Sequence, residues 1–103
     1  MAQEFIAVAV DEALLSFDEL TATCAVSVEW VIEHVQAGVL LEAPDPDVNT
    51  WKFSGQDLRR ARRIRDLERT FDAGPELAGL VVDLLEETER LRARLRRAGL
   101  SID

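Results

Sequence analysis

The sequence predicts a mainly α-helical fold: a winged helix-turn-helix with a short β-hairpin wing, followed by a C-terminal coiled-coil helix. Three observations support this class. Two short capped helices are separated by a tight break, two β-tolerant runs flank a Pro/Asp turn, and apolar residues near the C-terminus recur at alternating spacings of four and three. A chain of 103 residues has room for one small domain and one further element. We therefore expect a winged helix-turn-helix domain with an N-terminal arm over residues 1–72 and a dimerisation helix over residues 73–103.

Two serines are placed to cap the helices of the helix-turn-helix. Ser16, with Glu19 three residues later, matches a capping box and predicts a helix over about residues 17–23. Ser27 can cap a second helix over residues 28–37, in which apolar residues recur at spacings of three and four. Two short helices joined by a turn of a few residues are typical of a helix-turn-helix.

The wing is expected immediately after the second helix. Residues 39–42 and 50–53 are β-tolerant and flank a Pro/Asp loop, which predicts a hairpin. Trp51 and Phe53 are two apart and would share one face of its second strand. We interpret both as core anchors, with ligand or base stacking as the less favoured alternative. Residues 3–10 are predicted to be a short strand or an extended arm.

Two longer helices complete the chain. Ser54 marks the start of a helix over residues 55–72, and Pro75 opens the last one. The last helix carries a heptad seam of Leu77, Val81, Leu84, Thr88, Leu91, Leu95 and Ala98. Its first half is expected to pack on its own domain through Leu77, Leu80, Val81, Leu84 and Leu85. A homodimer is expected through residues 84–98, with Leu84, Thr88, Leu91 and Leu95 at its centre.

The net charge of −8 is distributed unevenly along the chain. Residues 1–51 contain ten acidic residues and no Lys or Arg, whereas residues 52–103 contain ten acidic and twelve basic residues. Proteins that bind duplex DNA neutralise phosphates with Lys and Arg, and these contacts supply much of the affinity. The sequence therefore makes direct DNA binding by the helix-turn-helix unfavourable and favours a basic protein as its partner.

The second helix carries the candidate contact residues for such a partner. Glu29 and Glu33 are four residues apart, so they share one helix face and can pair with two cations. Trp30 beside them is either an exposed aromatic anchor for the interface or packs against the N-terminal arm. The expected steering charges are Asp18, Glu19, Glu42, Asp45 and Asp47.

Basic residues are concentrated in the third helix, at Arg59, Arg60, Arg62, Arg63, Arg65 and Arg69. The favoured interpretation is a solvated face that neutralises the acidic first half and the acidic start of the last helix. The alternative is that these arginines hold DNA phosphates or an acidic partner.

Catalytic and metal chemistry is not indicated. The single histidine, His34, and the single cysteine, Cys24, cannot build a catalytic triad or a tetrahedral zinc site. We expect no enzyme activity, no cofactor and no metal; Cys24 should fill the core, and His34 should be partly exposed. No membrane span or secretory signal is visible in the sequence, so a cytoplasmic location is expected.

The order of these elements resembles the MerR-type winged-helix regulators. Residues 26–40 are similar to their recognition-helix region, and residues 53–58 to the entry into the helix after the wing. Residues 50–53, the arginine-rich helix and the leucine-rich helix after Pro75 resemble, more narrowly, the chaperone modulatory proteins of the CbpM family.

This resemblance implies an inhibitor that binds the J-domain of a DnaJ-type, CbpA-like co-chaperone and restrains its action on the Hsp70 chaperone DnaK. J-domains present a basic helix to Hsp70, so an acidic competitor is physically reasonable. Two alternatives stay open at this point: a MerR-type DNA-binding transcriptional regulator, and an adaptor for another basic helical partner.

Overall fold

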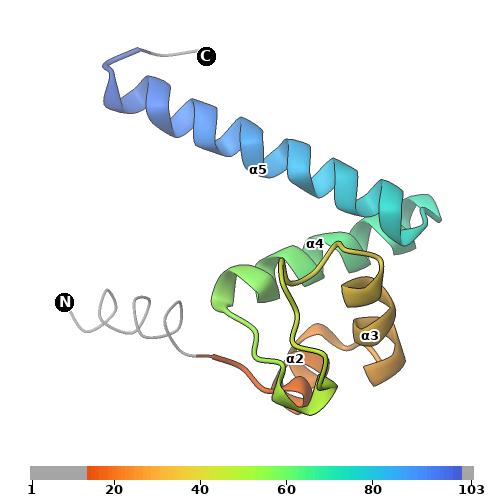
Figure 1. The fold of residues 1–103 in the computed structure, drawn as a ribbon. Coiled ribbons are helices and arrows are strands. Elements are labelled where there is room, and N and C mark those ends of the chain that lie inside the picture. The colour runs from red at the N-terminus through yellow and green to blue at the C-terminus, as the bar shows by residue number, and fades with distance from the viewer. Residues whose placement is uncertain (1–13, 101–103) are drawn as a thin grey trace.

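The computed structural model describes residues 14–100, and this part of the chain is almost entirely helical (Figure 1). The predicted mainly α class is confirmed, and the predicted helix bounds agree with the structure to within one or two residues. The predicted arm over residues 3–10 lies outside the described residues. The helices are α2 (Phe17–Cys24), α3 (Val28–Gln36), the short 3-10 helix η1 (Val48–Thr50), α4 (Gly55–Phe71) and α5 (Pro75–Arg97).

The predicted capping hydrogen bonds form at the starts of the first two helices. The Ser16 hydroxyl accepts from the Glu19 N–H at 3.2 Å, and the Glu19 carboxylate accepts from the Ser16 N–H at 2.8 Å. Ala25 ends α2 with a φ of 56°, in the left-handed region, and the Ser27 hydroxyl caps α3 through the Trp30 N–H. The chain therefore turns between α2 and α3 within three residues, as expected for a helix-turn-helix.

The predicted β-hairpin wing is wrong. Within residues 14–100 no strand ladder forms, and Phe53 pairs instead with Leu15 in an isolated antiparallel bridge, with N···O distances of 2.6 and 2.9 Å. Residues 39–47 form an irregular loop, and the 3-10 helix η1 follows it and ends at Thr50, where the second strand was predicted to begin.

Local hydrogen bonds explain why this segment forms a 3-10 turn. The Asp47 carboxylate accepts from the Asn49 N–H, and the Asp47 carbonyl accepts from the Thr50 hydroxyl at 2.8 Å. Such side-chain bonds give the backbone an alternative to a ladder. The Trp51 indole N–H also donates to the Asp45 carbonyl at 2.7 Å, which folds the loop back over the ring.

The core lies where α2, α3, α4 and the loop meet. Trp51 and Phe53 are both buried, so their prediction as core anchors is confirmed, although neither lies on a hairpin. Phe17 stacks on Trp51 at a centroid distance of 5.6 Å and meets Phe53 edge-on at 5.9 Å. Cys24 is fully buried, as predicted for a core position.

Helix α5 docks on the domain through a different face from the one predicted. The buried residues of α5 are Ala78, Gly79 and Val82. Four of the five residues expected to pack back on the domain are exposed instead: Leu77, Leu80, Leu84 and Leu85. With about 100° of rotation per residue, these buried residues fall on the side of the helix opposite Leu77, Leu80 and Leu84. The small face allows a close approach, and a Cβ on Gly79 would lie 2.4 Å from Val39 Cγ1.

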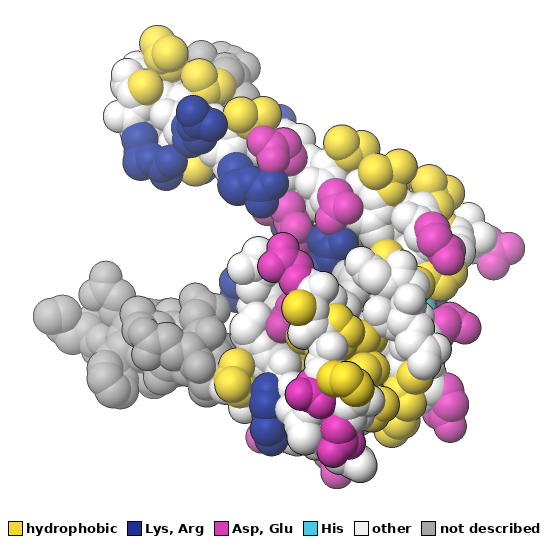
Figure 2. Space-filling view, viewed as in Figure 1, with side chains coloured by type: hydrophobic (Ala, Val, Ile, Leu, Met, Phe, Trp, Pro, Cys, Tyr) yellow, Lys and Arg dark blue, Asp and Glu magenta, His cyan; other side chains and the backbone are white. Residues whose placement is uncertain are grey.

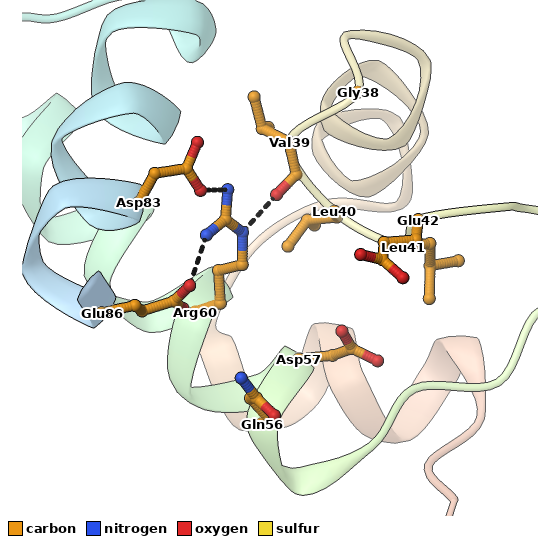
Figure 3. A pocket seen from close by; sticks show the side chains of 10 residues that line it. All are labelled: Gly38, Val39, Leu40, Leu41, Glu42, Gln56, Asp57, Arg60, Asp83 and Glu86. Carbon is orange, nitrogen blue, oxygen red and sulfur yellow. Dashed lines mark hydrogen bonds and ion pairs between the residues drawn. The ribbon is translucent and has the colours of Figure 1, made fainter. Parts of the chain in front are cut away.

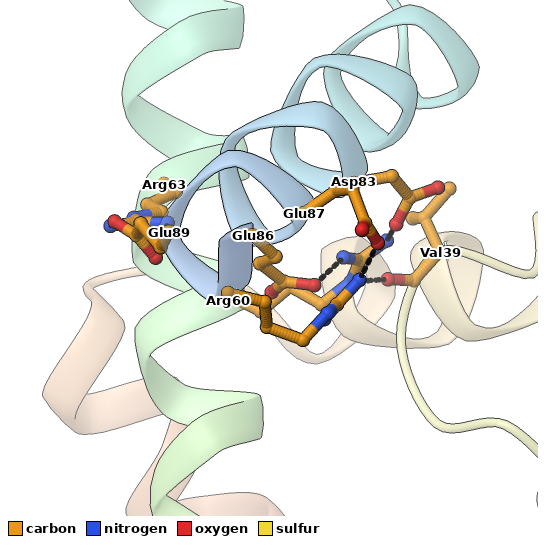
Figure 4. A network of polar contacts seen from close by, with 8 residues as sticks. Val39, Arg60, Arg63, Asp83, Glu86, Glu87 and Glu89 are labelled. Carbon is orange, nitrogen blue, oxygen red and sulfur yellow. Dashed lines mark hydrogen bonds and ion pairs between the residues drawn. The ribbon is translucent and has the colours of Figure 1, made fainter. Parts of the chain in front are cut away.

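Arg60 of α4 joins α5 to the loop after α3. Its guanidinium bonds to the Val39 carbonyl at 2.6 Å, to Asp83 at 2.8 Å and to Glu86 at 3.0 Å (Figures 3 and 4). The side chain is only 15% exposed, so these three acceptors hold a largely buried cation. The contact fixes the position of the first half of α5, whereas the C-terminal end of α5 stands apart from the other helices in Figure 1.

Candidate functional site

Helix α3 presents two acidic side chains to solvent. Glu29 and Glu33 are both exposed, and neither makes an ion pair with a Lys or Arg in the part of the chain that the structure describes. The closest basic atom to Glu33 is Nδ1 of His34, at 3.9 Å. The face of α3 that the sequence analysis selected therefore carries two exposed carboxylates without a Lys or Arg partner among the described residues.

The other predicted acidic residues lie on α2 and on the loop after α3, and they differ in how free they are. Figure 2 shows acidic side chains around the helix-turn-helix part of this face and basic ones gathered on the C-terminal half of α5. Asp45 accepts from the Asp47 N–H at 2.8 Å, and Asp47 caps η1, so both also have structural roles. Glu19 belongs to the capping box, and the Ser16 N–H lowers the pKa of its carboxyl. We call Asp18, Glu19, Glu29, Glu33, Glu42, Asp45 and Asp47 together the acidic surface.

A cavity of about 540 Å³ opens between α4, α5 and the loop after α3 (Figure 3). Of the predicted residues, only Glu42 lies at this cavity. Sequence reasoning missed the other acids around it, Asp57 of α4 with Asp83 and Glu86 of α5, because the docking of α5 brings them together. Arg60 lines the same cavity and neutralises part of this charge.

Trp30 is not the fully exposed anchor that was one of its two predicted roles, and the other role, packing against the N-terminal arm, lies outside the described residues. The ring is half-buried, its N–H donates to Glu68 Oε1 at 2.9 Å, and it stacks on His34 with ring centroids 3.7 Å apart. Because the polar edge of the indole is bonded to α4, only part of the ring is left for a partner.

His34 is buried, so the expectation of a partly exposed histidine is wrong. The side chain is 1% exposed, and its two ring nitrogens lie 2.7 Å from the Trp30 carbonyl and 2.6 Å from Glu68 Oε2. Glu68 was not identified from the sequence as a partner of α3. The spacing of four between Trp30 and His34 is the signal that could have indicated the stacking of their rings, but no local pattern points to Glu68.

The arginines of α4 are largely engaged within the molecule. Arg63 bonds to Glu89 at 2.5 Å, in addition to the contacts of Arg60 with Asp83 and Glu86. Arg65 bonds to Asp66 and to the Cys24 carbonyl, and Arg69 to the Ala25 carbonyl. Arg60 and Arg63 thus pair with acids of α5, as the favoured interpretation expected, but Arg60 and Arg65 are largely buried and do not belong to a solvated face.

The residues predicted for dimerisation lie along one side of α5. Leu84 is 60% exposed and Leu91 is 47% exposed; Thr88 is exposed between them, and Leu95 is half-buried. With Leu77 and Leu80 they form a stripe that points away from the domain. We call Leu77, Leu80, Leu84, Thr88, Leu91 and Leu95 the leucine stripe.

Two further features bear on chemistry. Burial raises the pKa of the Cys24 thiol, so this cysteine stays protonated near neutral pH. Within residues 14–100 no group of three or more His, Cys, Asp or Glu side chains is placed to hold a metal ion.

None of the described helices combines the length and the apolar character that a membrane span requires.

Comparison with known proteins indicates the class of protein to which the chain belongs. A family model described as the MerR HTH family regulatory protein matches residues 15–98, and no solved structure matches the chain. Curated relatives named chaperone modulatory protein CbpM, from the Coxiella burnetii strains Dugway 5J108-111, RSA 331 / Henzerling II and CbuG_Q212, are each 30% identical over 82 residues. The alignments cover 80% of this chain and 76% of each relative.

The chain therefore belongs to the CbpM family of MerR-like proteins. The names of the relatives support a role as a chaperone modulator, and together with the MerR-like domain they point to a non-enzymatic regulator.

Proposed function

We propose that the protein binds the J-domain of a DnaJ-type, CbpA-like co-chaperone and inhibits its action on the Hsp70 chaperone DnaK. Membership of the CbpM family supports the chaperone context. The observation that carries the proposal is the exposure of Glu29 and Glu33 on α3, neither of which pairs with a Lys or Arg among the described residues. We expect this action in the cytoplasm.

Charge complementarity gives the proposal its mechanism. A basic helix of the J-domain would be attracted to the acidic surface, and opposite charges raise the association rate and exclude partners of the wrong sign. Occupying that helix would deny it to Hsp70, so inhibition would result from competition. Because the charges are exposed, the attraction should weaken as salt is added.

The cavity beside Glu42 extends the acidic surface towards α5. Its walls combine Glu42, Asp83 and Glu86 with the apolar residues Leu40 and Leu41. A long basic side chain suits such a site, because its aliphatic stem can cover apolar surface while its head meets carboxylates.

The proposed inhibition can be measured as ATP hydrolysis by DnaK. Adding the protein to DnaK and the co-chaperone should suppress the stimulated rate in proportion to occupancy of the J-domain. DnaK alone serves as the control and should keep its basal rate. Stimulation that persists at saturating protein would contradict the proposal.

The MerR-like domain is compatible with the alternative, a DNA-binding transcriptional regulator. The charges of the described residues oppose it, because α3 and the loop after it carry acids and no Lys or Arg. Carboxylates facing a phosphate backbone repel it. A mobility-shift assay at low and moderate salt tests this alternative, and tight, sequence-selective retention of DNA would favour it.

We also propose that the protein is a homodimer through the leucine stripe of α5. A helix with an exposed stripe of this length is marginal in water unless it docks on a partner. Acids dominate the first half of α5 and arginines the second half. An antiparallel pair would place each half opposite its complement, whereas a parallel pair would place like charges together.

A further inference from the structure

Trp30, His34 and Glu68 form a closed hydrogen-bonded network between α3 and α4. Each carboxylate oxygen of Glu68 has its own partner: Oε1 lies 2.9 Å from the indole nitrogen, and Oε2 lies 2.6 Å from His34 Nε2. The second ring nitrogen, Nδ1, lies 2.7 Å from the Trp30 carbonyl oxygen. The proposed function makes no use of this network.

The partners of His34 determine how many protons the network must hold. A carbonyl oxygen can only accept, so Nδ1 carries a hydrogen. A neutral imidazole has a single N–H, so in that state Nε2 would direct a lone pair at the Glu68 carboxylate from 2.6 Å. The observed contact is favourable only when the His34–Glu68 pair contains one more proton.

We propose that His34 is held as an imidazolium paired with the Glu68 carboxylate at neutral pH, and that this proton acts as a latch fastening α3 to α4. The proton resides on the ring because a carboxylic acid gives up its proton more readily than an imidazolium does. When the proton leaves, two buried acceptors face each other and the contact between the helices weakens. Helix α3 then loosens, and with it the position of Glu29 and Glu33.

The surrounding charges favour the cation. Glu33 on α3 lies 3.9 Å from Nδ1, and burial keeps the thiol of Cys24, the buried titratable group of α2, neutral. On α4, Arg65 bonds to Asp66 and Arg69 bonds to the Ala25 carbonyl. The charged groups lining the adjoining cavity of about 480 Å³, which ends at Pro75 of α5, are Glu33, Glu68 and Asp72 against Arg65 and Arg69. Glu33 and Glu68 thus place two carboxylates within 4 Å of the ring nitrogens of His34.

Nitrogen NMR of the imidazole tests the protonation state directly. His34 is the only histidine of the chain, so its ring signals need no separate assignment. At pH 7.5 both ring nitrogens of the wild type should be protonated. Glu68→Gln should give the neutral ring with its hydrogen on Nδ1, because the amide can donate to Nε2 and still accept from Trp30. Glu76→Gln, which removes an exposed charge on α5 outside this network, is the control and should leave the imidazolium in place; a neutral ring in the wild type would overturn the proposal.

A second measurement tests the latch through stability. Above about pH 6.5 an unfolded histidine has lost most of its proton, so unfolding of the wild type between pH 7 and 8 should release about one proton. Stability should therefore fall as the pH rises in the wild type and stay nearly flat in Glu68→Gln. His34→Gln, which keeps a donor towards Glu68, should also be flat and covers the case in which Glu68→Gln does not fold. Equal slopes in the wild type and these variants would overturn the latch.

Discussion

At the scale of single residues, the pKa of an acidic side chain in this protein depends on whether the group is buried or paired with a cation. Cys24 is fully buried at the end of α2, and its thiol pKa is raised because the thiolate would lose its hydration there. The Glu89 carboxyl, exposed on α5, has its pKa lowered by the hydrogen bond from Arg63. Burial and pairing thus move acids in opposite directions within one small domain.

The raised pKa of Cys24 predicts a loss of stability in alkali. The folded state keeps the thiol proton at a pH where the unfolded chain has lost it, so the free energy of unfolding falls as the pH rises above about 8.5. The chain has no tyrosine and a single lysine, Lys52, which is exposed, so few other groups titrate up to pH 10.

Urea unfolding at pH 8, 9 and 10 checks this prediction. Cys24→Ala should be less stable than the wild type at pH 8, because it leaves a small void, but should lose less stability between pH 8 and 10. Parallel pH profiles for the two proteins would show that the thiol is not responsible.

For single residues, the sequence predicted roles that depend on near neighbours in the chain but not roles that depend on distant ones. Ser16 and Ser27 were identified as caps because capping depends on residues three positions apart. The burial of His34 could not be predicted in this way, because its partner Glu68 is 34 positions away along the chain.

At the scale of elements, the docking of α5 depends on one glycine. Gly79 lies in the interior of the helix, where glycine is about 1 kcal/mol less favourable than alanine. Its absent side chain allows α5 to approach Val39, and a Cβ there would meet both Cγ1 and Cβ of that valine. Close packing at this point outweighs helix propensity.

We predict that Gly79→Ala destabilises the protein by about 1–3 kcal/mol despite the better helix former, because the added methyl overpacks the contact. Val39→Ala in the same chain should recover part of the loss, because it removes Cγ1 but keeps Cβ, and thermal or urea unfolding of all four proteins completes a double-mutant cycle. Gly74→Ala is the matched control, since the nearest atom to its new Cβ would be 3.9 Å away, and its effect should be small. A stabilised Gly79→Ala protein would contradict the close approach.

Element starts were predictable from the sequence, but faces and pairings were not. The wing prediction failed because Asp45 and Asp47 bond locally and Phe53 pairs with Leu15, 38 positions earlier, which no short-range pattern reveals. The heptad pattern correctly marked a stripe on α5, but a pattern does not say whether the domain or a partner covers it. The small residues Ala78 and Gly79 dock α5, so the domain does not cover the stripe.

At the scale of the whole molecule, the leucine stripe and the acidic surface are separate features. The stripe runs along the side of α5 opposite the docked face, and the acidic surface belongs to α2, α3 and the loop after α3. A second copy on the stripe would therefore leave the acidic surface of each protomer open to a partner.

If the protein is a dimer through the leucine stripe, introducing charged residues into the stripe should halve its mass in solution. Leu84→Asp/Leu91→Asp should convert the dimer to a folded monomer, because two carboxylates cannot be buried without partners. Leu14→Asp/Leu100→Asp, which alters two exposed leucines off the stripe, should remain dimeric. Analytical ultracentrifugation with circular dichroism measures both, and a monomeric wild type would refute the dimer.

The central claim is that the acidic surface binds the basic helix of a J-domain, and its most direct test is the affinity of the purified protein for that domain. Glu29→Lys/Glu33→Lys should weaken binding at least about tenfold, since it places cations opposite cations, and wild-type affinity should fall with salt. Glu76→Lys/Glu87→Lys changes the net charge equally on α5 and should bind like the wild type. Unchanged affinity in Glu29→Lys/Glu33→Lys, with circular dichroism confirming its fold, would contradict the account.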